Sequence, residues 1–111
     1  MSDAPSFDVG CVLSRIGAGG QVLPIASGYR HLRRHDPAEP VTVPLRACCV
    51  TLMPGEALRL SLSAAAFPAF PVNPGTGADP TQCGIADARI IQLGLRHGGD
   101  QASCVRLPVI G

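Results

Sequence analysis

One proline- and glycine-rich stretch, Phe67 to Gly77, sets the strongest limit on how this chain can fold. It contains two of the three phenylalanines and three of the eleven prolines. Each proline fixes its own φ and drives the preceding residue toward extended backbone, while Gly75 and Gly77 allow sharp turns. The stretch is therefore predicted to be a stiff loop, neither helix nor the middle of a sheet. Phe67 and Phe70 are expected to anchor this loop to the body of the domain.

Period-two apolar patterns on both sides of the loop predict β-strands. The clearest is Leu58–Ser63, in which leucines alternate with arginine and serine, and the longest is Val41–Leu52. Further strands are predicted over residues 7–13, 21–27, 88–96 and 103–110, with turns at residues 17–20, 53–56 and 97–100. Six or seven short strands and no helical pattern predict one all-β domain over residues 1–111, an antiparallel β-sandwich.

The only basic cluster combines three arginines with two histidines: Arg30, Arg33, Arg34, His31 and His35. Nucleic-acid binding would require more basic residues and more aromatic side chains for stacking, so a solvated face or a contact with another domain is the favoured interpretation. His31 and His35 lack the helical zinc motif, and adjacent Cys48 and Cys49 point to opposite sides of a strand. No metal site is predicted.

No pattern in the chain predicts catalysis or cofactor binding. There is no Gly-x-Ser-x-Gly elbow, and Ser103, His97 and Asp100 flank a single turn, where a catalytic triad could not form. Gly17–Gly20 precedes a predicted strand and not a helix, which favours a hairpin turn over a phosphate-binding loop. No catalytic, cofactor-binding or metal-ligating residue is therefore predicted.

The number of cysteines and the length of the apolar segments indicate in which cellular compartment the protein lies. The five cysteines form no paired framework, the N-terminus carries no targeting pattern, and prolines interrupt the most apolar window, residues 64–72. These features predict reduced thiols, a cytoplasmic protein and no membrane span.

An ordered series of motifs along the chain resembles the C-terminal β domain of the X-prolyl dipeptidyl-peptidase and cocaine-esterase group of serine hydrolases. The series comprises Ser2–Asp8 with Val12-Leu13, Gly28-Tyr29-Arg30, Pro54-Gly55 with Leu58-Arg59-Leu60, Phe67-Pro68-x-Phe70 with Asn73-Pro74-x-Thr76-Gly77, and Ser103–Val109. The chain departs from the family at Glu56 and Ala57, which replace a His-Arg pair, and at Cys104, which replaces an arginine.

The resemblance implies a jelly-roll sandwich of the galactose-binding-like type. It also implies that the catalytic triad lies in an α/β-hydrolase domain and that further strands normally precede Ser2. The sandwich is thus expected to be incomplete, with an open strand edge. The implied function is a non-catalytic domain that packs on the hydrolase domain, helps to shape its substrate cleft and supports a homo-oligomer. Two alternatives remain open: a free-standing β-sandwich module that binds carbohydrate or protein, and a truncated, self-associating fragment.

Overall fold

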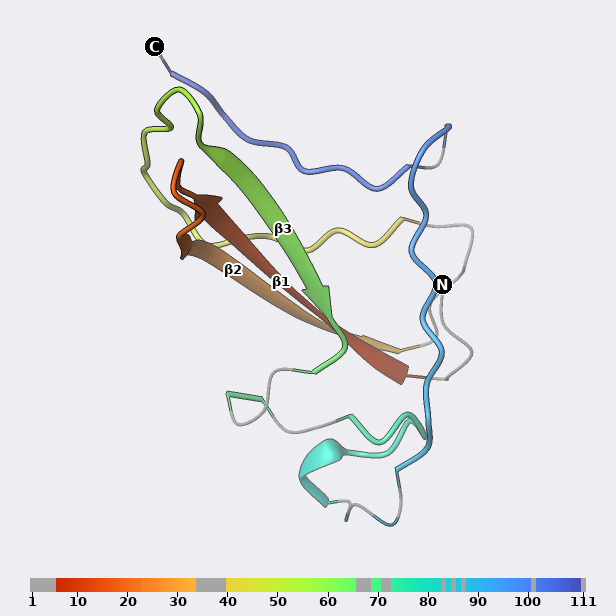
Figure 1. Cartoon of the computed structure of the whole chain (residues 1–111). Helices are drawn as coiled ribbons and strands as arrows, with labels where there is room; N and C mark the ends of the chain where they lie inside the picture. Colours follow the sequence, from red (N-terminus) through yellow and green to blue (C-terminus); the bar gives the residue numbers. More distant parts are fainter. Residues whose placement is uncertain are drawn as a thin grey trace.

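The computed structural model describes residues 6–33, 40–65, 69–70, 73–82, 84, 86, 88–100 and 102–110. In these residues the chain forms three β-strands and one 3-10 turn: β1 (Ser6–Ile16), β2 (Val22–Arg33), β3 (Ala57–Ser63) and η1 (Pro80–Gln82). The strands make one antiparallel sheet in the order β2-β1-β3, so β1 lies in the middle (Figure 1). The all-β prediction is confirmed, and a single open sheet is consistent with an incomplete β-sandwich.

The glycine-rich turn between β1 and β2 is a hairpin, as its sequence predicts. The Gly17 amide donates to the Gln21 carbonyl at 2.8 Å, and the Gly20 amide donates to the Gly17 carbonyl at 2.9 Å. Gly20 has a φ of 89°, a left-handed conformation that glycine adopts without steric cost. Since a strand and not a helix follows, this loop has no helix N-terminus with which to bind phosphate.

The turn that leads into β3 also has its predicted form. The Glu56 amide donates to the Met53 carbonyl at 3.0 Å, and Gly55 has a φ of 86°. Proline followed by a glycine of positive φ is the pattern of a type II turn. Glu56 then lies near Arg15 of β1, with 3.6 Å between Arg15 Nε and the carboxylate.

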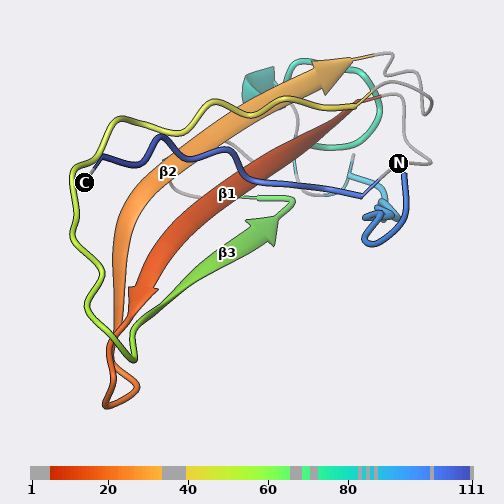
Figure 2. The same cartoon turned by 90° about the horizontal axis from the view of Figure 1, so that it is seen from above.

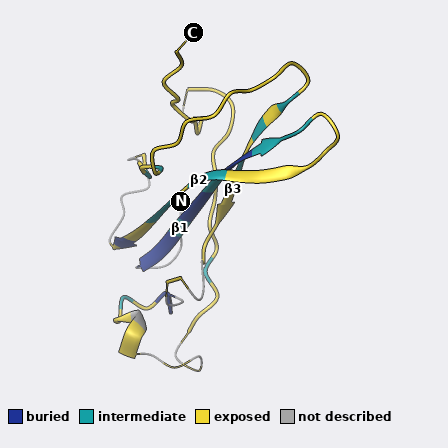
Figure 3. Ribbon diagram, turned by 90° about the vertical axis from the view of Figure 1, so that its left-hand side faces the viewer, coloured by how far each residue is buried: buried dark blue, intermediate teal, exposed yellow. Residues whose placement is uncertain are grey.

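The two faces of the sheet differ in polarity, because directly paired residues of antiparallel strands share a face. On the apolar face, Phe7 pairs with Leu32, and Leu13 lies between Ala26 and Leu60. Phe7, Leu13 and Leu32 are buried, together with Cys11. The polar face carries the pairs Ser6–Arg33, Asp8–His31 and Gly10–Tyr29, followed by Val12 between Ser27 and Ser61. As the middle strand, β1 is the most buried of the three (Figure 3).

The prediction of a strand over Val41–Leu52 is wrong. This segment is extended and runs beside β2 (Figure 2), but it forms no strand. The Arg46 amide donates to the Ser27 carbonyl at 3.0 Å, and Arg30 donates to the Thr42 carbonyl at 2.9 Å. A Cβ on Gly28 would collide with the Pro44 carbonyl, so glycine allows the close approach. A single backbone hydrogen bond to β2 does not make the repeating ladder of a sheet.

The predictions of strands over residues 88–96 and 103–110 are also wrong. Both segments are extended but lie outside the sheet in the described chain (Figure 1), and only Leu93 forms an isolated bridge. Their apolar side chains are largely exposed, with Leu95 at 60% and Val109 at 87%. The turn between them does form, because the Ser103 amide donates to the Arg96 carbonyl at 2.9 Å. A strand-like pattern becomes a strand only where a neighbouring strand forms a repeating ladder of hydrogen bonds with it.

In the part of the chain that the structure describes, no helix is both long enough and apolar enough to cross a membrane.

Candidate functional site

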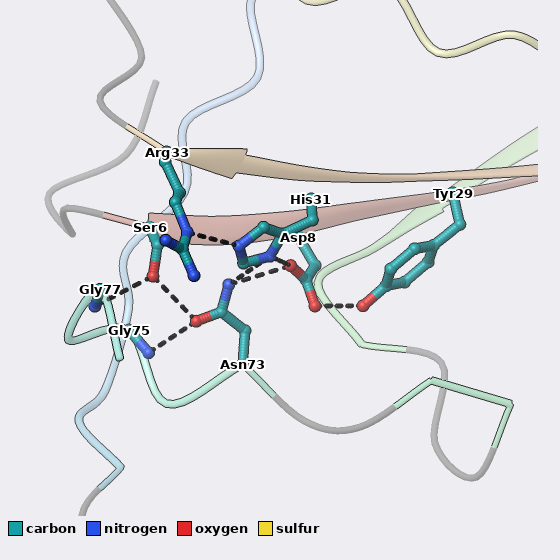
Figure 4. Close-up of polar contacts among 8 residues, drawn as sticks. All are labelled: Ser6, Asp8, Tyr29, His31, Arg33, Asn73, Gly75 and Gly77. Atoms are coloured by element: carbon teal, nitrogen blue, oxygen red, sulfur yellow. Dashed lines mark hydrogen bonds and ion pairs between the residues drawn. The ribbon is translucent and has the colours of Figure 1, made fainter. Parts of the chain in front are cut away.

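A cluster of polar side chains occupies the polar face of the sheet, at the start of β1 and the end of β2 (Figure 4). The register pairs Asp8 directly with His31 and Gly10 with Tyr29. In both strands the side chains two residues apart point to the same side. We call Ser6, Asp8, Tyr29, His31, Arg33 and Asn73 the polar cluster.

Asp8 is the centre of the polar cluster. Its side chain is 2% exposed, and its carboxylate has three donors around it. Tyr29 donates its hydroxyl proton to one carboxylate oxygen, while Asn73 Nδ2 at 2.9 Å and His31 Nδ1 at 2.6 Å approach the other. A buried carboxylate requires donors of this kind, because its removal from water is otherwise very unfavourable.

The contacts of His31 indicate its tautomer. Nδ1 lies against the Asp8 carboxylate, which can only accept, so Nδ1 carries the proton. Nε2 then accepts from Arg33 Nε at 3.3 Å. Asn73 Nδ2 lies 3.1 Å from His31 Nδ1, but both nitrogens are donors. Asn73 Nδ2 therefore donates to the Asp8 carboxylate and not to His31. The imidazole ring thus bridges Asp8 and Arg33.

Asn73 connects the polar cluster to the loop that begins at Phe67. Its Oδ1 accepts from the Ser6 hydroxyl at 3.0 Å and from the Gly75 amide at 2.9 Å. The Ser6 oxygen in turn accepts from the Gly77 amide at 3.2 Å. Residue 73 is 5% exposed, and Gly75 has a φ of 75° with Ile91 directly beside it. One asparagine therefore fixes the turn of the loop and attaches the loop to β1.

An aromatic stack provides the second attachment of the loop. The rings of Tyr29 and Phe70 are 3.8 Å apart at their centroids and parallel to within 2°. Burial, followed by the hydrogen bond to Asp8 and the negative charge of Asp8, raises the pKa of Tyr29 well above its usual value. The Phe70 ring is 42% exposed, so it packs on the polar face of the sheet and not in the apolar core.

The structure places the loop residues singled out by the sequence as follows. Phe70 and Asn73 contact the sheet as described, and the Pro74 carbonyl accepts from the Arg89 amide at 2.9 Å. Thr76 Oγ1 accepts from the Ala78 amide at 3.4 Å, and the Gly77 amide donates to Ser6. Phe67 and Pro68 lie outside the described residues.

Sequence reasoning missed Ser6, Asp8 and Tyr29 as members of a cluster, and it assigned His31 and Arg33 to a basic surface. One sequence signal could have shown that these side chains share a face. Tyr29, His31 and Arg33 are spaced two residues apart, which continues the strand predicted over residues 21–27. Asp8 lies in the predicted period-two strand over residues 7–13, directly after Phe7. It lies on the face opposite Phe7 and is buried there because Asn73 and the loop cover it.

The polar cluster has the groups of an acid–base pair but no nucleophile. The Ser6 hydroxyl donates to Asn73 and not to His31, so no base activates it. The described residues contain no group of three or more His, Cys, Asp or Glu side chains that could hold a metal ion. His97 and Asp100 lie around one exposed turn, with Ser103 just beyond it. What the cluster does is hold the loop against the sheet.

These features define a β domain whose polar cluster attaches a loop to one face of an open sheet. The family model for the X-Pro dipeptidyl-peptidase C-terminal non-catalytic domain matches residues 1–97 of the chain. The chain therefore belongs to this family, and the sequence-based recognition is confirmed. A search of curated proteins gave no match.

Proposed function

We propose that the chain is an accessory domain of a serine hydrolase of the X-Pro dipeptidyl-peptidase or acyl-esterase type. In this proposal it completes a jelly-roll sandwich together with its partner, packs on an α/β-hydrolase domain and helps to shape the substrate cleft. Family membership supports the non-catalytic character of the domain. The polar cluster supports it too, since Ser6, the serine of this cluster, donates to the side-chain amide of Asn73 and not to His31.

The observation that carries the proposal is the amount of uncovered surface, which includes many large apolar side chains. The chain exposes 8172 Å², whereas a folded monomer of 11.4 kDa exposes about 5,800 Å². Its radius of gyration is 16.1 Å, compared with about 13 Å for a compact domain of this length. Exposed apolar residues include Met53 at 59% and Ile90 at 90%. Large apolar side chains exposed in this number mark a protein interaction site.

The size of this surface favours a large partner. The excess in total accessible surface, polar and apolar together, is roughly 2,400 Å², well above the roughly 800 Å² that each protein contributes to a standard interface. The uncovered surface also includes residues 88–96 and 103–110, which keep a strand-like alternation without a described neighbouring strand. A hydrolase domain that covered these segments would bury their exposed apolar side chains.

The structure gives little support to the alternative of a sugar-binding module. Carbohydrate sites use exposed aromatic rings, and this chain has one tyrosine and no tryptophan. One face of the Tyr29 ring is covered by Phe70. We also propose a cytoplasmic location, which rests on the odd number of cysteines, and self-association of the domain.

Co-purification from the native cells tests the function. The tagged chain should bring down a polypeptide with a Gly-x-Ser-x-Gly elbow, identified by mass spectrometry. The complex should cleave an X-Pro arylamide or an aryl ester, and a serine-directed inhibitor should abolish this activity. The isolated chain should show no turnover. Inhibitor-sensitive turnover by the isolated chain would contradict the proposal. So would a co-purification in which no serine hydrolase binds the tagged chain.

A further inference from the structure

The two edges of the sheet differ in how they are covered. The outer edge of β2 is met by the segment around residues 42–46, through the hydrogen bond from the Arg46 amide to Ser27. In the described chain, β3 has β1 on one side and no strand on the other. Figure 2 shows β3 at the open margin of the sheet, with no described segment alongside it.

The β3 strand lacks the devices that normally prevent edge pairing. Natural edge strands carry lysine, proline, a bulge or an inward charge. β3 has the sequence ALRLSLS, with Arg59 as its single charge, and its pairing with β1 is regular. Leu58, Leu60 and Leu62 share the apolar face, and Leu62 is 41% exposed. An uncovered, regular and alternating strand of this kind is a template for another strand.

We propose that β3 pairs antiparallel with β3 of a second copy of this chain, about a two-fold axis at Ser61. The two three-stranded sheets then become one six-stranded sheet. This inference deepens the self-association part of the proposed function and does not depend on the hydrolase partner.

The arrangement of side chains on β3 selects this register. A two-fold axis at Arg59 would place two arginines directly opposite each other, and an axis at Leu60 would place them diagonally, about 7–8 Å apart. An axis between two residues would set leucines against serines. With the axis at Ser61, Arg59 faces Ser63 of the second copy, and the two arginines lie roughly 13 Å apart along the strands.

The same register completes the apolar face. Leu62 of each copy lies opposite Leu60 of the other, so the exposed Leu62 side chain gains an apolar neighbour. Ser61 lies opposite Ser61 of the second copy, and the two hydroxyls can hydrogen-bond to each other. A second copy of β3 therefore places leucine opposite leucine and keeps the two Arg59 side chains apart. No acidic residue of another protein is needed to neutralise Arg59. Self-pairing of this kind forms an isologous interface, the type found in two-fold symmetric dimers.

Charge substitutions at Ser61 test the pairing directly. Size-exclusion chromatography with light scattering should give the wild-type chain a mass twice the 11.4 kDa of one copy. A loading concentration of roughly 0.1 mM keeps the dimer populated even if its dissociation constant is micromolar. Ser61→Lys should place two cations opposite each other and raise the dimer dissociation constant by about tenfold or more. Ser61→Glu should do the same with two anions. An equimolar mixture of the two variants should recover the dimer.

Ser27→Lys is the matched control. Ser27 and Ser61 flank the same residue, Val12, on the same face of the sheet, and both are exposed. Ser27 lies on the β2 edge, so its substitution should leave the dimer intact. A monomeric wild-type chain, no recovery in the mixture, or an equal loss with Ser27→Lys would overturn the inference. So would a finding that Ser61→Lys prevents hydrolase binding while the chain alone stays monomeric. Failure to find any hydrolase partner would leave the dimer result intact.

Discussion

Asn73 is the single side chain whose removal should release the loop from the sheet. Asn73→Ala deletes the bond from Nδ2 to the Asp8 carboxylate and the acceptor for both the Ser6 hydroxyl and the Gly75 amide. A hydrogen bond to a charged group contributes about 1.5–3 kcal/mol, and each buried polar group left unpaired costs about 1–3 kcal/mol. Because the loop can partly relax toward water, we expect a total loss of about 3 kcal/mol.

Urea unfolding followed by tyrosine fluorescence measures this loss. Tyr29 is the only tyrosine and the chain has no tryptophan, so the signal comes from the polar cluster itself. Thr76→Ala is the control in the same loop, since its 3.4 Å bond to Ala78 is exposed and should contribute less than about 0.5 kcal/mol. Equal effects of Asn73→Ala and Thr76→Ala would refute the assignment of Asn73 as the anchor.

Three further changes test neighbouring contacts. Phe70→Ala should lower the free energy of unfolding by about 1 kcal/mol, since the stack on Tyr29 is worth about 0.5–1.5 kcal/mol and the ring is already 42% exposed; a loss of 3 kcal/mol or more would mean a fully buried ring. Because the folded state raises the pKa of Tyr29, its stabilising effect should be complete below about pH 10 and decline as the pH rises further. Absorbance at the tyrosinate band should therefore titrate later in the folded chain than in urea, and coincident curves would contradict the Asp8 contact. Gly28→Ala should displace the segment against β2 and speed amide exchange at Arg46, whereas Gly19→Ala, which meets only the flexible Gln21 side chain, should not.

Local features of the chain were predictable because their causes are local. The turns at Gly17–Gly20 and Met53–Glu56 need glycines that adopt positive φ, and both stand at those positions. β1 shows a period-two pattern that ends at the Gly17–Gly20 turn, so hairpin geometry brings it to β2. β3 shows the same local pattern, but its pairing with β1 joins segments that are far apart in the sequence. The all-β class followed from these elements.

The polar cluster could not be predicted, because it depends on register and on contacts across long stretches of sequence. Asp8 meets His31 only in one alignment of β1 with β2, and a slip of one residue would move it to the other face. Asn73 reaches Asp8 across 65 positions of the chain. No periodicity within β2 indicates that Arg33 will bond His31 and not solvent.

Two features separate what the sequence determines from what the tertiary structure decides. They are the loop from Phe67 to Gly77 and the three segments that were predicted as strands but do not form them. Proline and glycine by themselves determine that this loop is irregular, since they act on φ and on the backbone donors of their own residues. Only the tertiary structure decides that Asn73 and Phe70 attach it to the polar face. Likewise, alternation over residues 41–52, 88–96 and 103–110 makes each segment suitable for a strand. Whether it becomes one depends on a neighbour, because the hydrogen bonds of a strand are made to another strand.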